Sequence, residues 1–457
     1  MGAKVSRVTP ERTSVDQGHL IEASPNVPSS KVALPENQAQ TLPLPADLTL
    51  DFPFFKDPLT VEYFQDSKVI LIMRGLPGSG KSHLTKVITQ LYPHATICSA
   101  DDYYSLTGMY EFDPSRLKDA HAYSQAKADQ ECNKGTSVVI IDNTNVTRWE
   151  MIPYVKMGNA YKYVVLLIEP KTPWFKDAEE LARRNTHNVS VDLLKRRLHA
   201  WQKMSPLYYG WFLNEADTWL LKRVGDAWLE RCLEVSDFLE DFMGWSGLEC
   251  PEDMMKYYQR MEPELLHCTA MFSGRGKVPG SREYERKSEV ENALGQAFHL
   301  HMIGFFITSR SFGIRVKLTE DQLNVWAQND FEEEIPALPT RSKHTRRNSD
   351  QNPVVLEPRA SLISVQQSQE VMAHRMRPLK SEGRRAHITL AFKPGERPMC
   401  TGFDAMKVAE FEGRDSQTDL CKVYQVPGGI LCSYGKGIWV IYPEIQYVAI
   451  SLFAGFY

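Results

Sequence analysis

Two copies of the triplet His-x-Thr lie inside apolar, strand-like runs of this 457-residue chain. They occupy His267–Thr269 and His387–Thr389, and a phenylalanine follows each threonine by three positions, at Phe272 and Phe392. Because alternate residues of a strand face the same side, each histidine shares a face with its threonine. If the two strands lie side by side, two imidazoles and two hydroxyls surround one cleft.

Such a set of side chains suits chemistry on a phosphate ester. One imidazole takes a proton from water while the other gives a proton to the departing oxygen, and both roles suit a pKa near neutrality. The hydroxyls of Thr269 and Thr389 hold the non-bridging oxygens as charge builds on phosphorus, and no metal is needed. The alternative is two structural histidines in a sheet. Further triplets at His83 and His94 lie in a predicted helix and a connection, and are expected by chance.

A second motif predicts nucleotide binding. Gly75–Ser82 reads GLPGSGKS, which matches G-x-x-x-x-G-K-[ST] in full. It lies between a predicted strand, Lys68–Met73, and a helix from Lys81 to about Tyr92, which is the context that the motif requires. The loop residues whose backbone wraps a phosphate are Gly75, Gly78, Ser79 and Gly80. Lys81 reaches the outer phosphates and the Ser82 hydroxyl ligates Mg²⁺, so ATP or GTP with Mg²⁺ is the expected ligand of this loop.

Acidic residues follow two further predicted strands. Asp101 and Asp102 come after Ala95–Ser99, and Asp142 comes after Ser137–Ile141. An aspartate there can hold the metal's water or take a proton from an attacking hydroxyl, although each can equally be a helix N-cap. Arg184 lies in a basic helical stretch that can close over the nucleotide as a lid or form a solvated helix face.

Composition limits the class of protein. The 53 Lys and Arg residues against 57 Asp and Glu give a net charge of -4, which excludes a globally basic nucleic-acid binder but not a local basic patch. No apolar run approaches the ~20 residues that span a bilayer. The eight cysteines form no C-x-x-C pair, which favours reduced thiols in a cytoplasmic protein. Met1–Ser6 matches the myristoylation pattern, so acylation of Gly2 and weak peripheral membrane association are possible outcomes.

The chain divides into a tail and two predicted domains. Residues 1–50 are rich in Pro, Ser and Gln and predict a disordered tail. Residues 51–225 alternate apolar strands with helices, which is typical of an α/β domain with a parallel sheet. Residues 226–457 carry shorter, alternating strands and predict a mixed α+β domain. A disordered basic insertion interrupts it at about residues 341–383, and Arg346–Ser349 within it is a basophilic-kinase-type phosphosite or an unmodified loop.

The first domain resembles the polynucleotide-kinase-like branch of P-loop proteins. The resemblance rests on the phosphate loop, the Asp-containing segment after the second strand and the arginine-bearing lid. It implies that Asp101 or Asp102 activates a 5′-hydroxyl and that Arg184 is the lid arginine.

The paired H-x-T motifs resemble those that define the 2H phosphoesterases. The order of a phosphate-loop domain and then an H-x-T domain is similar to that of the 2′,3′-cyclic nucleotide 3′-phosphodiesterases, and this similarity runs from about Phe52 to near the C-terminus, excluding the basic insertion. The segments that carry this resemblance are Pro206–Leu213, Leu266–Thr269, Gly276–Gly280 and Arg385–Leu390. It implies hydrolysis of a 2′,3′-cyclic phosphate to the 2′-phosphate without a cofactor. The implied roles are a base for water (His387), an acid for the 3′-oxygen (His267), phosphate binding (Thr269, Thr389), base stacking (Phe272) and substrate contacts (Arg385, Tyr208).

Three functions follow from these patterns. The first is a monomeric phosphodiesterase for cyclic nucleotides or RNA ends. The second is a bifunctional RNA end-healing enzyme, in which the P-loop domain phosphorylates a 5′-hydroxyl. The third is a scaffold that binds RNA or membrane through the basic insertion and the tail. Intact catalytic motifs argue against the third as the whole function.

Overall fold

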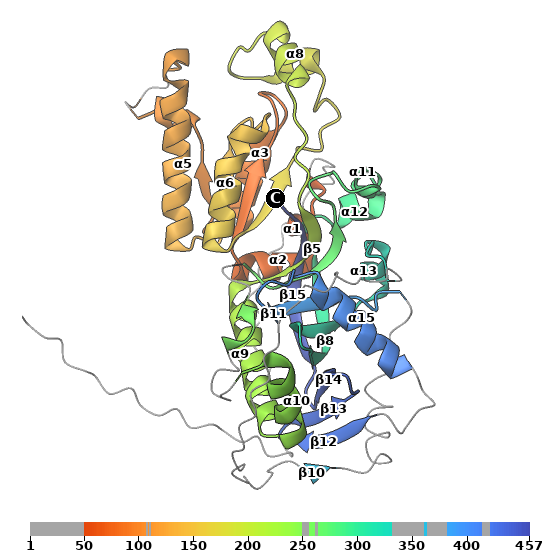
Figure 1. The fold of residues 1–457 in the computed structure, drawn as a ribbon. Coiled ribbons are helices and arrows are strands. Elements are labelled where there is room, and N and C mark those ends of the chain that lie inside the picture. Colours follow the sequence, from red (N-terminus) through yellow and green to blue (C-terminus); the bar gives the residue numbers. More distant parts are fainter. Residues whose placement is uncertain are drawn as a thin grey trace, which may run out of the picture. The chain divides into compact units, whose positions relative to one another are not determined.

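The computed structural model describes residues 50–106, 108, 111–248, 256–260, 264–330, 361–362, 382–413 and 421–457. The expected tail with Gly2, the phosphosite at Ser349 and most of the basic insertion lie outside these residues. Two sheets organise the described part, one parallel and one antiparallel (Figure 1). The prediction of an α/β P-loop domain followed by an α+β domain is confirmed.

The parallel sheet has the strand order β2-β3-β1-β4. Its strands are β1 (Val69–Met73), β2 (Thr96–Cys98), β3 (Val138–Asp142) and β4 (Val164–Ile168). Strand β1 is buried throughout because it lies between β3 and β4 and helices cover both faces. Side chains of α5 (Leu117–Lys134) and α6 (Arg148–Tyr161) pack on one face, and those of α2 (Pro58–Asp66) and α3 (Lys81–Leu91) pack on the other.

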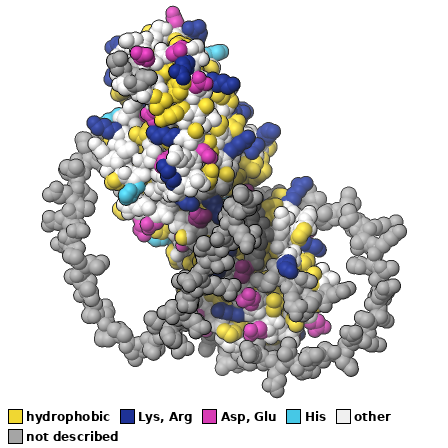
Figure 2. All heavy atoms as spheres, turned by 90° about the vertical axis from the view of Figure 1, so that its left-hand side faces the viewer, with side chains coloured by type: hydrophobic (Ala, Val, Ile, Leu, Met, Phe, Trp, Pro, Cys, Tyr) yellow, Lys and Arg dark blue, Asp and Glu magenta, His cyan; other side chains and the backbone are white. Residues whose placement is uncertain are grey.

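This domain also contains short helical elements. They are α1 (Pro53–Lys56), α4 (Asp101–Tyr104), the 3-10 turn η2 (Pro114–Arg116), α7 (Ala178–Arg184) and α8 (Val191–His199). Figure 2 shows one face of the molecule, on which lysine and arginine side chains are interspersed with acidic and apolar ones. That distribution agrees with the nearly balanced composition.

The antiparallel sheet runs in the order β10-β12-β13-β14-β8-β15-β5-β7-β11-β6, and β9 pairs with both β11 and β8. Its strands are β5 (Tyr208–Leu213), β6 (Gln259–Arg260), β7 (His267–Phe272), β8 (Ala297–Ile307), β9 (Ser311–Lys317), β10 (Ser361–Leu362), β11 (His387–Phe392), β12 (Lys422–Val426), β13 (Gly429–Ser433), β14 (Trp439–Pro443) and β15 (Tyr447–Phe456). The two H-x-T strands, β7 and β11, are neighbours in this order.

Helices bury the faces of the antiparallel sheet. The largest core contains side chains of α9 (Glu215–Leu233) and α10 (Ser236–Ser246) together with those of β7, β8, β9 and β11. A separate core lies beneath α15 (Cys400–Gly413) and includes Phe306, Ala405 and Val440. Three shorter helices, α11 (Ser281–Tyr284), α12 (Ser288–Ala293) and α13 (Glu320–Asn324), complete the domain. No helix among the residues that the structure describes is long and apolar enough to cross a bilayer.

One hydrophobic core joins the two sheets. It contains Leu71 of β1, Leu166 of β4, Phe212 of β5 and Leu452 of β15, all of them buried. The Tyr63 hydroxyl of α2 donates to the carbonyl oxygen of Phe212 at 3.2 Å. The described part of the chain therefore has no solvated linker between its two sheets at this seam.

Two predicted boundaries differ from the structure. The expected domain boundary at residues 225/226 falls inside α9, and β5 already belongs to the antiparallel sheet. Apolar strand β5 lies between two helical segments of the sequence, and its place in a sheet depends on strands that come later in the chain. Within the expected basic insertion, Ser361–Leu362 forms strand β10, which pairs with Gln425 and Tyr424 of β12 rather than being disordered.

Candidate active site

The two H-x-T motifs lie on paired antiparallel strands. Ile388 of β11 is registered opposite Cys268 of β7. Both of these middle residues are fully buried in the main core, whereas the histidine and threonine on either side of each are partly exposed. Alternation along a strand therefore places all four functional side chains on the other face.

The antiparallel register arranges these four side chains crosswise. Extending the Ile388–Cys268 pair by one residue in each direction sets His267 opposite Thr389 and His387 opposite Thr269. Each imidazole thus has a hydroxyl of the other motif across from it. This pseudo-twofold arrangement can surround a single phosphoryl group.

Both imidazoles are anchored in the same way. Nδ1 of His267 lies 3.0 Å from the carbonyl oxygen of Leu265, and Nδ1 of His387 lies 2.7 Å from the carbonyl oxygen of Arg385. A carbonyl oxygen can only accept, so Nδ1 carries the proton in each ring. Nε2 is left as the ring nitrogen that does not take part in this backbone contact.

Desolvation lowers the pKa of both histidines. Desolvation, with smaller effects of the positive charges of Arg385 and of a protonated His267, lowers the pKa of His387 to about 4, although the hydrogen bond to the Arg385 carbonyl opposes this. Desolvation likewise lowers the pKa of His267, while its backbone hydrogen bond and Glu264 act in the opposite direction. Both rings are therefore neutral at pH 7 in the ligand-free protein.

Two aromatic rings of β5 pack against His267. The Tyr208 ring stacks on it with centroids 4.7 Å apart and planes at 18°, and the Phe212 ring lies at 5.2 Å. Burial raises the pKa of Tyr208 far above its usual value, and its buried hydroxyl has no hydrogen-bond partner among the described residues. Tyr208, predicted to contact substrate, thus contacts the imidazole of His267 through its ring.

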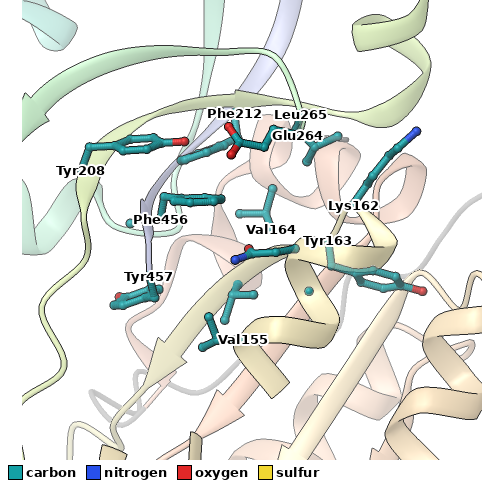
Figure 3. Close-up of a pocket in the computed structure, with 14 residues that line it drawn as sticks. Val155, Lys162, Tyr163, Val164, Tyr208, Phe212, Glu264, Leu265, Phe456 and Tyr457 are labelled. Carbon is teal, nitrogen blue, oxygen red and sulfur yellow. The ribbon is translucent and has the colours of Figure 1, made fainter. Parts of the chain in front are cut away.

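A narrow hollow lies behind this aromatic wall (Figure 3). Tyr208, Phe212 and Glu264 line it together with Lys162 and Phe456. Its free volume of about 30 Å³ is too small for a nucleotide. This hollow is therefore not the candidate substrate site.

Phe272 reaches the same face as His267 because β7 contains a bulge. Strict alternation would place Phe272 opposite the histidine. However, Tyr209 pairs with Met271 while Gly210 pairs with Thr269, which leaves Ala270 as the extra residue. Phe272 then pairs with Tyr208, and its side chain is 51% exposed. An exposed aromatic ring beside the histidine is available for stacking.

Strand β11 has a bulge at the same place in its motif. Thr389 pairs with Gly313 and Ala391 pairs with Phe312, so Leu390 is the extra residue. Phe392 is thereby turned to the face of His387, although it is only 8% exposed. The H-x-T-x-x-F repeat therefore encodes a strand with a bulge directly after the threonine.

Arg385 is buried next to His387 and held from several directions. Its Nη1 donates to the carbonyl oxygen of Asn329 at 3.2 Å, and its guanidinium lies 4.4 Å from the ring centroid of Phe403. The side chain faces α15, whose Gly402 also borders the His387 ring. Sequence reasoning missed Gly402, and no motif marked it.

The phosphate loop has the backbone that its sequence predicts. Gly78 and Gly80 take positive φ angles of 86° and 102°, which favour glycine. Trp174 Nε1 donates to the carbonyl oxygen of Gly78 at 3.1 Å, and Thr172 Oγ1 donates to that of Ser79 at 3.1 Å. The loop is therefore clamped by the segment that follows β4.

Two polar groups of the loop fit an anionic ligand. Ser79 Oγ is buried with no hydrogen-bond partner in the described ranges. Desolvation lowers the pKa of Lys81, whose Nζ has a long 3.5 Å contact to the carbonyl oxygen of Leu76. Desolvation also raises the pKa of Asp142, against the effect of Lys81. A bound phosphate group would place negative charge beside Lys81 and so favour its protonated form.

The structure distinguishes the two adjacent aspartates. Asp102 forms an ion pair with Lys127 at 2.9 Å. Asp101 acts electrostatically on both Lys81 and Asp142, and Asp102 also acts on Asp142. Of the two expected bases, Asp102 is therefore the one held by an ion pair, and Asp101 is the one that acts on Lys81.

The lid arginine lies beside the loop clamp. Arg184 is in the last turn of α7, and its guanidinium is 3.8 Å from the ring centroid of Trp174. Its Nε is also 3.2 Å from Glu180, and the side chain is 47% exposed. Arg184 therefore borders the loop but is engaged by neighbours in this structure.

Comparison with known proteins identifies both domains. A family model described as 2′,3′-cyclic nucleotide 3′-phosphodiesterase matches residues 205–346 and 369–457, and an AAA domain model matches residues 70–206. The 2′,3′-cyclic-nucleotide 3′-phosphodiesterases of Rattus norvegicus and Mus musculus are each 30% identical over 416 residues, covering 89% of this chain and 87% of theirs. The junction between the two models agrees with the structural boundary just before β5.

A further relative matches a smaller part of the chain. NEDD4-binding protein 2 of Homo sapiens is 44% identical over 135 residues, which is 30% of this chain and 8% of that protein. This likeness therefore covers less than a third of the chain.

Proposed function

Because the chain belongs to the 2′,3′-cyclic nucleotide 3′-phosphodiesterase family, we propose that it hydrolyses 2′,3′-cyclic phosphates of nucleotides or RNA 3′ ends to 2′-phosphates. The observation that carries the proposal is the crosswise placement of two H-x-T motifs on paired strands. Each motif offers an Nε2 atom and a hydroxyl to one face, which is what in-line displacement at phosphorus requires.

His387 acts as the base in the proposed reaction. Its Nε2 takes a proton from water as the water oxygen bonds to phosphorus. The bond from phosphorus to the 3′-oxygen breaks, and His267 Nε2 gives its proton to that oxygen. The lowered pKa of His387, at about 4, supports its role as the base, because the base must begin neutral. The negative phosphate favours the protonated form of His267 when substrate is bound.

The remaining side chains bind the substrate in this proposal. Thr269 and Thr389 donate hydroxyl hydrogen bonds to the non-bridging oxygens, and Arg385 adds positive charge beside the phosphate. Phe272 stacks on the base, as aromatic rings do with unpaired bases. All steps use protein side chains and water, so chelation of metal is expected to leave hydrolysis unchanged.

A hydrolysis assay tests the proposal. Purified protein is given 2′,3′-cyclic NADP or a cyclic-ended oligonucleotide in EDTA, alongside His267→Ala, His387→Ala and His94→Ala. His94 belongs to a third H-x-T triplet but is exposed and outside the site, so it is the matched control. We expect each active-site variant to lose about 10²–10⁴-fold in rate and the control to match wild type. Wild-type protein without hydrolysis, or full activity in both active-site variants, contradicts the proposal.

A second activity is proposed for the P-loop domain, because Lys81, Asp101 and Asp142 converge there. ATP or GTP with Mg²⁺ would bind the loop, with Ser82 as a metal ligand and Arg184 on the transferring group. The bound metal would neutralise phosphate charge. Asp101 would accept a proton from the 5′-hydroxyl of RNA, which makes the chain an RNA end-healing enzyme with both activities.

Phosphorylation of a 5′-hydroxyl RNA tests this second activity. Labelled ATP and Mg²⁺ are supplied to wild type, Lys81→Ala, Asp101→Asn and Asp102→Asn. We expect the label to be lost in the first two variants and largely kept in Asp102→Asn, whose carboxylate is paired with Lys127. Nucleotide binding without transfer in wild type contradicts kinase activity while leaving the hydrolase proposal intact.

A further inference from the structure

We propose that Asp330 is a positioning residue for His387, acting through the turn that precedes β11. Asp330 is 4% exposed. Its Oδ1 accepts from the backbone N–H of Arg385 at 3.0 Å, and its Oδ2 accepts from the backbone N–H of Gly383 and from Trp326 Nε1, both at 2.8 Å. One buried carboxylate thus binds three donors, two of them in the turn before the catalytic strand.

The turn transmits this anchoring to the imidazole. Asp330 holds Arg385 at its N–H, and the carbonyl oxygen of Arg385 accepts from His387 Nδ1 at 2.7 Å. The backbone carbonyl of Asp330 also accepts from Arg384 Nε at 2.7 Å. The direction of the Arg385 carbonyl fixes both the tautomer and the tilt of the His387 ring. Freeing the turn would therefore change where Nε2 points.

The same segment is tied to the other H-x-T strand. The backbone N–H of Ala327 donates to the carbonyl oxygen of Ala270 at 3.1 Å, and Gln328 Nε2 lies 3.4 Å from the carbonyl oxygen of Thr269. Residues 326–330 thus contact β7 at one end and the turn before β11 at the other. We call this segment the bridge, and it ties together the two strands that carry the motifs.

The bridge also connects two parts of the chain that are far apart in sequence. Asp330 and Gly383 are 53 positions apart, yet the carboxylate of one binds the backbone of the other. Gly383 has a φ of 81°, a conformation that glycine adopts at little cost. The entropic cost of closing a loop grows only slowly with the number of residues in it. Hydrogen bonds between the two ends can therefore hold the site even though the ends are far apart in sequence.

The alternative is that Asp330 only stabilises the domain. Rates alone do not separate the two roles, because an unstable protein also loses activity. A matched control comes from Asp241 of α10, whose Oδ2 likewise accepts from a buried indole, Trp439 Nε1, at 2.9 Å. Asp241→Asn removes a comparable carboxylate–indole contact on a helix that bears none of the active-site residues.

The test compares Asp330→Asn with Asp241→Asn in the full chain. The measurements are kcat and KM for 2′,3′-cyclic NADP, and the pKa of His387 from its Cε1–H resonance, assigned by its absence in His387→Ala. For Asp330→Asn we expect kcat to fall about 10–100-fold, the size of effect that a displacement of ~1 Å produces, and the pKa of His387 to move. Asp241→Asn should change neither.

The inference rests on the proposed function only for its kinetic arm. If wild-type protein does not hydrolyse the substrate, the proposed function fails, and the His387 resonance still tests the bridge. An Asp330→Asn protein that folds with an unchanged His387 pKa and wild-type kcat overturns the inference. Equal changes in both variants also overturn it, because they indicate general destabilisation. A shift of the His387 pKa confined to Asp330→Asn supports it.

Discussion

Gly402 lies so close to His387 that a Cβ atom on Gly402 would come within 3.0 Å of Cε1 of the imidazole. The same Cβ atom would lie 2.9 Å from Nε of Arg385. Gly402 is in the first turn of α15, so this helix packs directly against two side chains of the candidate site. Glycine has only a hydrogen in place of a side chain, so Gly402 leaves room for the His387 ring in its observed orientation.

Substitution of Gly402 is therefore expected to damage the site while leaving the helix intact. Gly402→Ala should lower kcat about 10-fold or more, because a misplaced catalytic group loses rate steeply with distance. Gly413→Ala, at the other end of α15, is the control, since no atom of the described residues is found within 4 Å of its Cβ position. Steady-state kinetics and thermal unfolding of both variants check the prediction. Unchanged kcat in Gly402→Ala would show that the imidazole adapts.

The pH dependence of kcat/KM should follow the lowered histidine pKa values. The base must be neutral, so activity rises as pH increases through the pKa of His387, at about 4. The acid must be protonated, so activity falls as pH increases through the pKa of His267, which desolvation lowers from 6.5. We expect a bell-shaped profile with its maximum below pH 6.5. A profile that keeps rising to pH 8 would contradict these assignments.

Phe272 provides a separate test of substrate recognition. Base stacking contributes about 1–3 kcal/mol per base, so Phe272→Ala should raise KM about 5–100-fold with a smaller effect on kcat. Phe272→Tyr keeps the aromatic face and should stay close to wild type. Kinetics with a cyclic nucleotide check both variants. If Phe272→Ala leaves KM unchanged, the exposed ring is not a base platform.

Much of this site is predictable from the spacing of its residues. The alternation of side chains along a strand predicts that His267 and Thr269 share a face. A glycine-rich loop between a predicted strand and a predicted helix indicates that Lys81 lies at the phosphate loop. The bulge at Ala270 is not predictable in this way, because an alanine in a strand carries no signal of an extra residue. Alternation alone would put Phe272 on the wrong face.

Other features arise only from contacts between distant segments. Asp330 precedes a long basic stretch and belongs to no motif, and its role depends on donors 53 and 55 positions later. The extent of the antiparallel sheet depends on such contacts too. Strand β5 follows the helices of the first domain in sequence, but its hydrogen-bond partners, β7 and β15, come later in the chain.

The shared core predicts that the two domains unfold together. Leu452 of β15 is fully buried and packs in the cluster that includes Leu71 and Leu166 of the parallel sheet. Leu452→Ala should lower the free energy of unfolding by about 2–5 kcal/mol, because it leaves a cavity in a close-packed core. Leu220→Ala is the control, as Leu220 is 49% exposed on α9 and should change stability by no more than ~0.5 kcal/mol.

Denaturant unfolding followed by two probes measures this coupling. Binding of a fluorescent nucleotide reports on the P-loop domain, and hydrolysis of a cyclic nucleotide reports on the antiparallel domain. Because Leu452 contacts both sheets, we expect the two midpoints to shift by the same amount in Leu452→Ala. If hydrolysis is lost at lower denaturant while nucleotide binding keeps its wild-type midpoint, the domains are independent and the seam does not couple them.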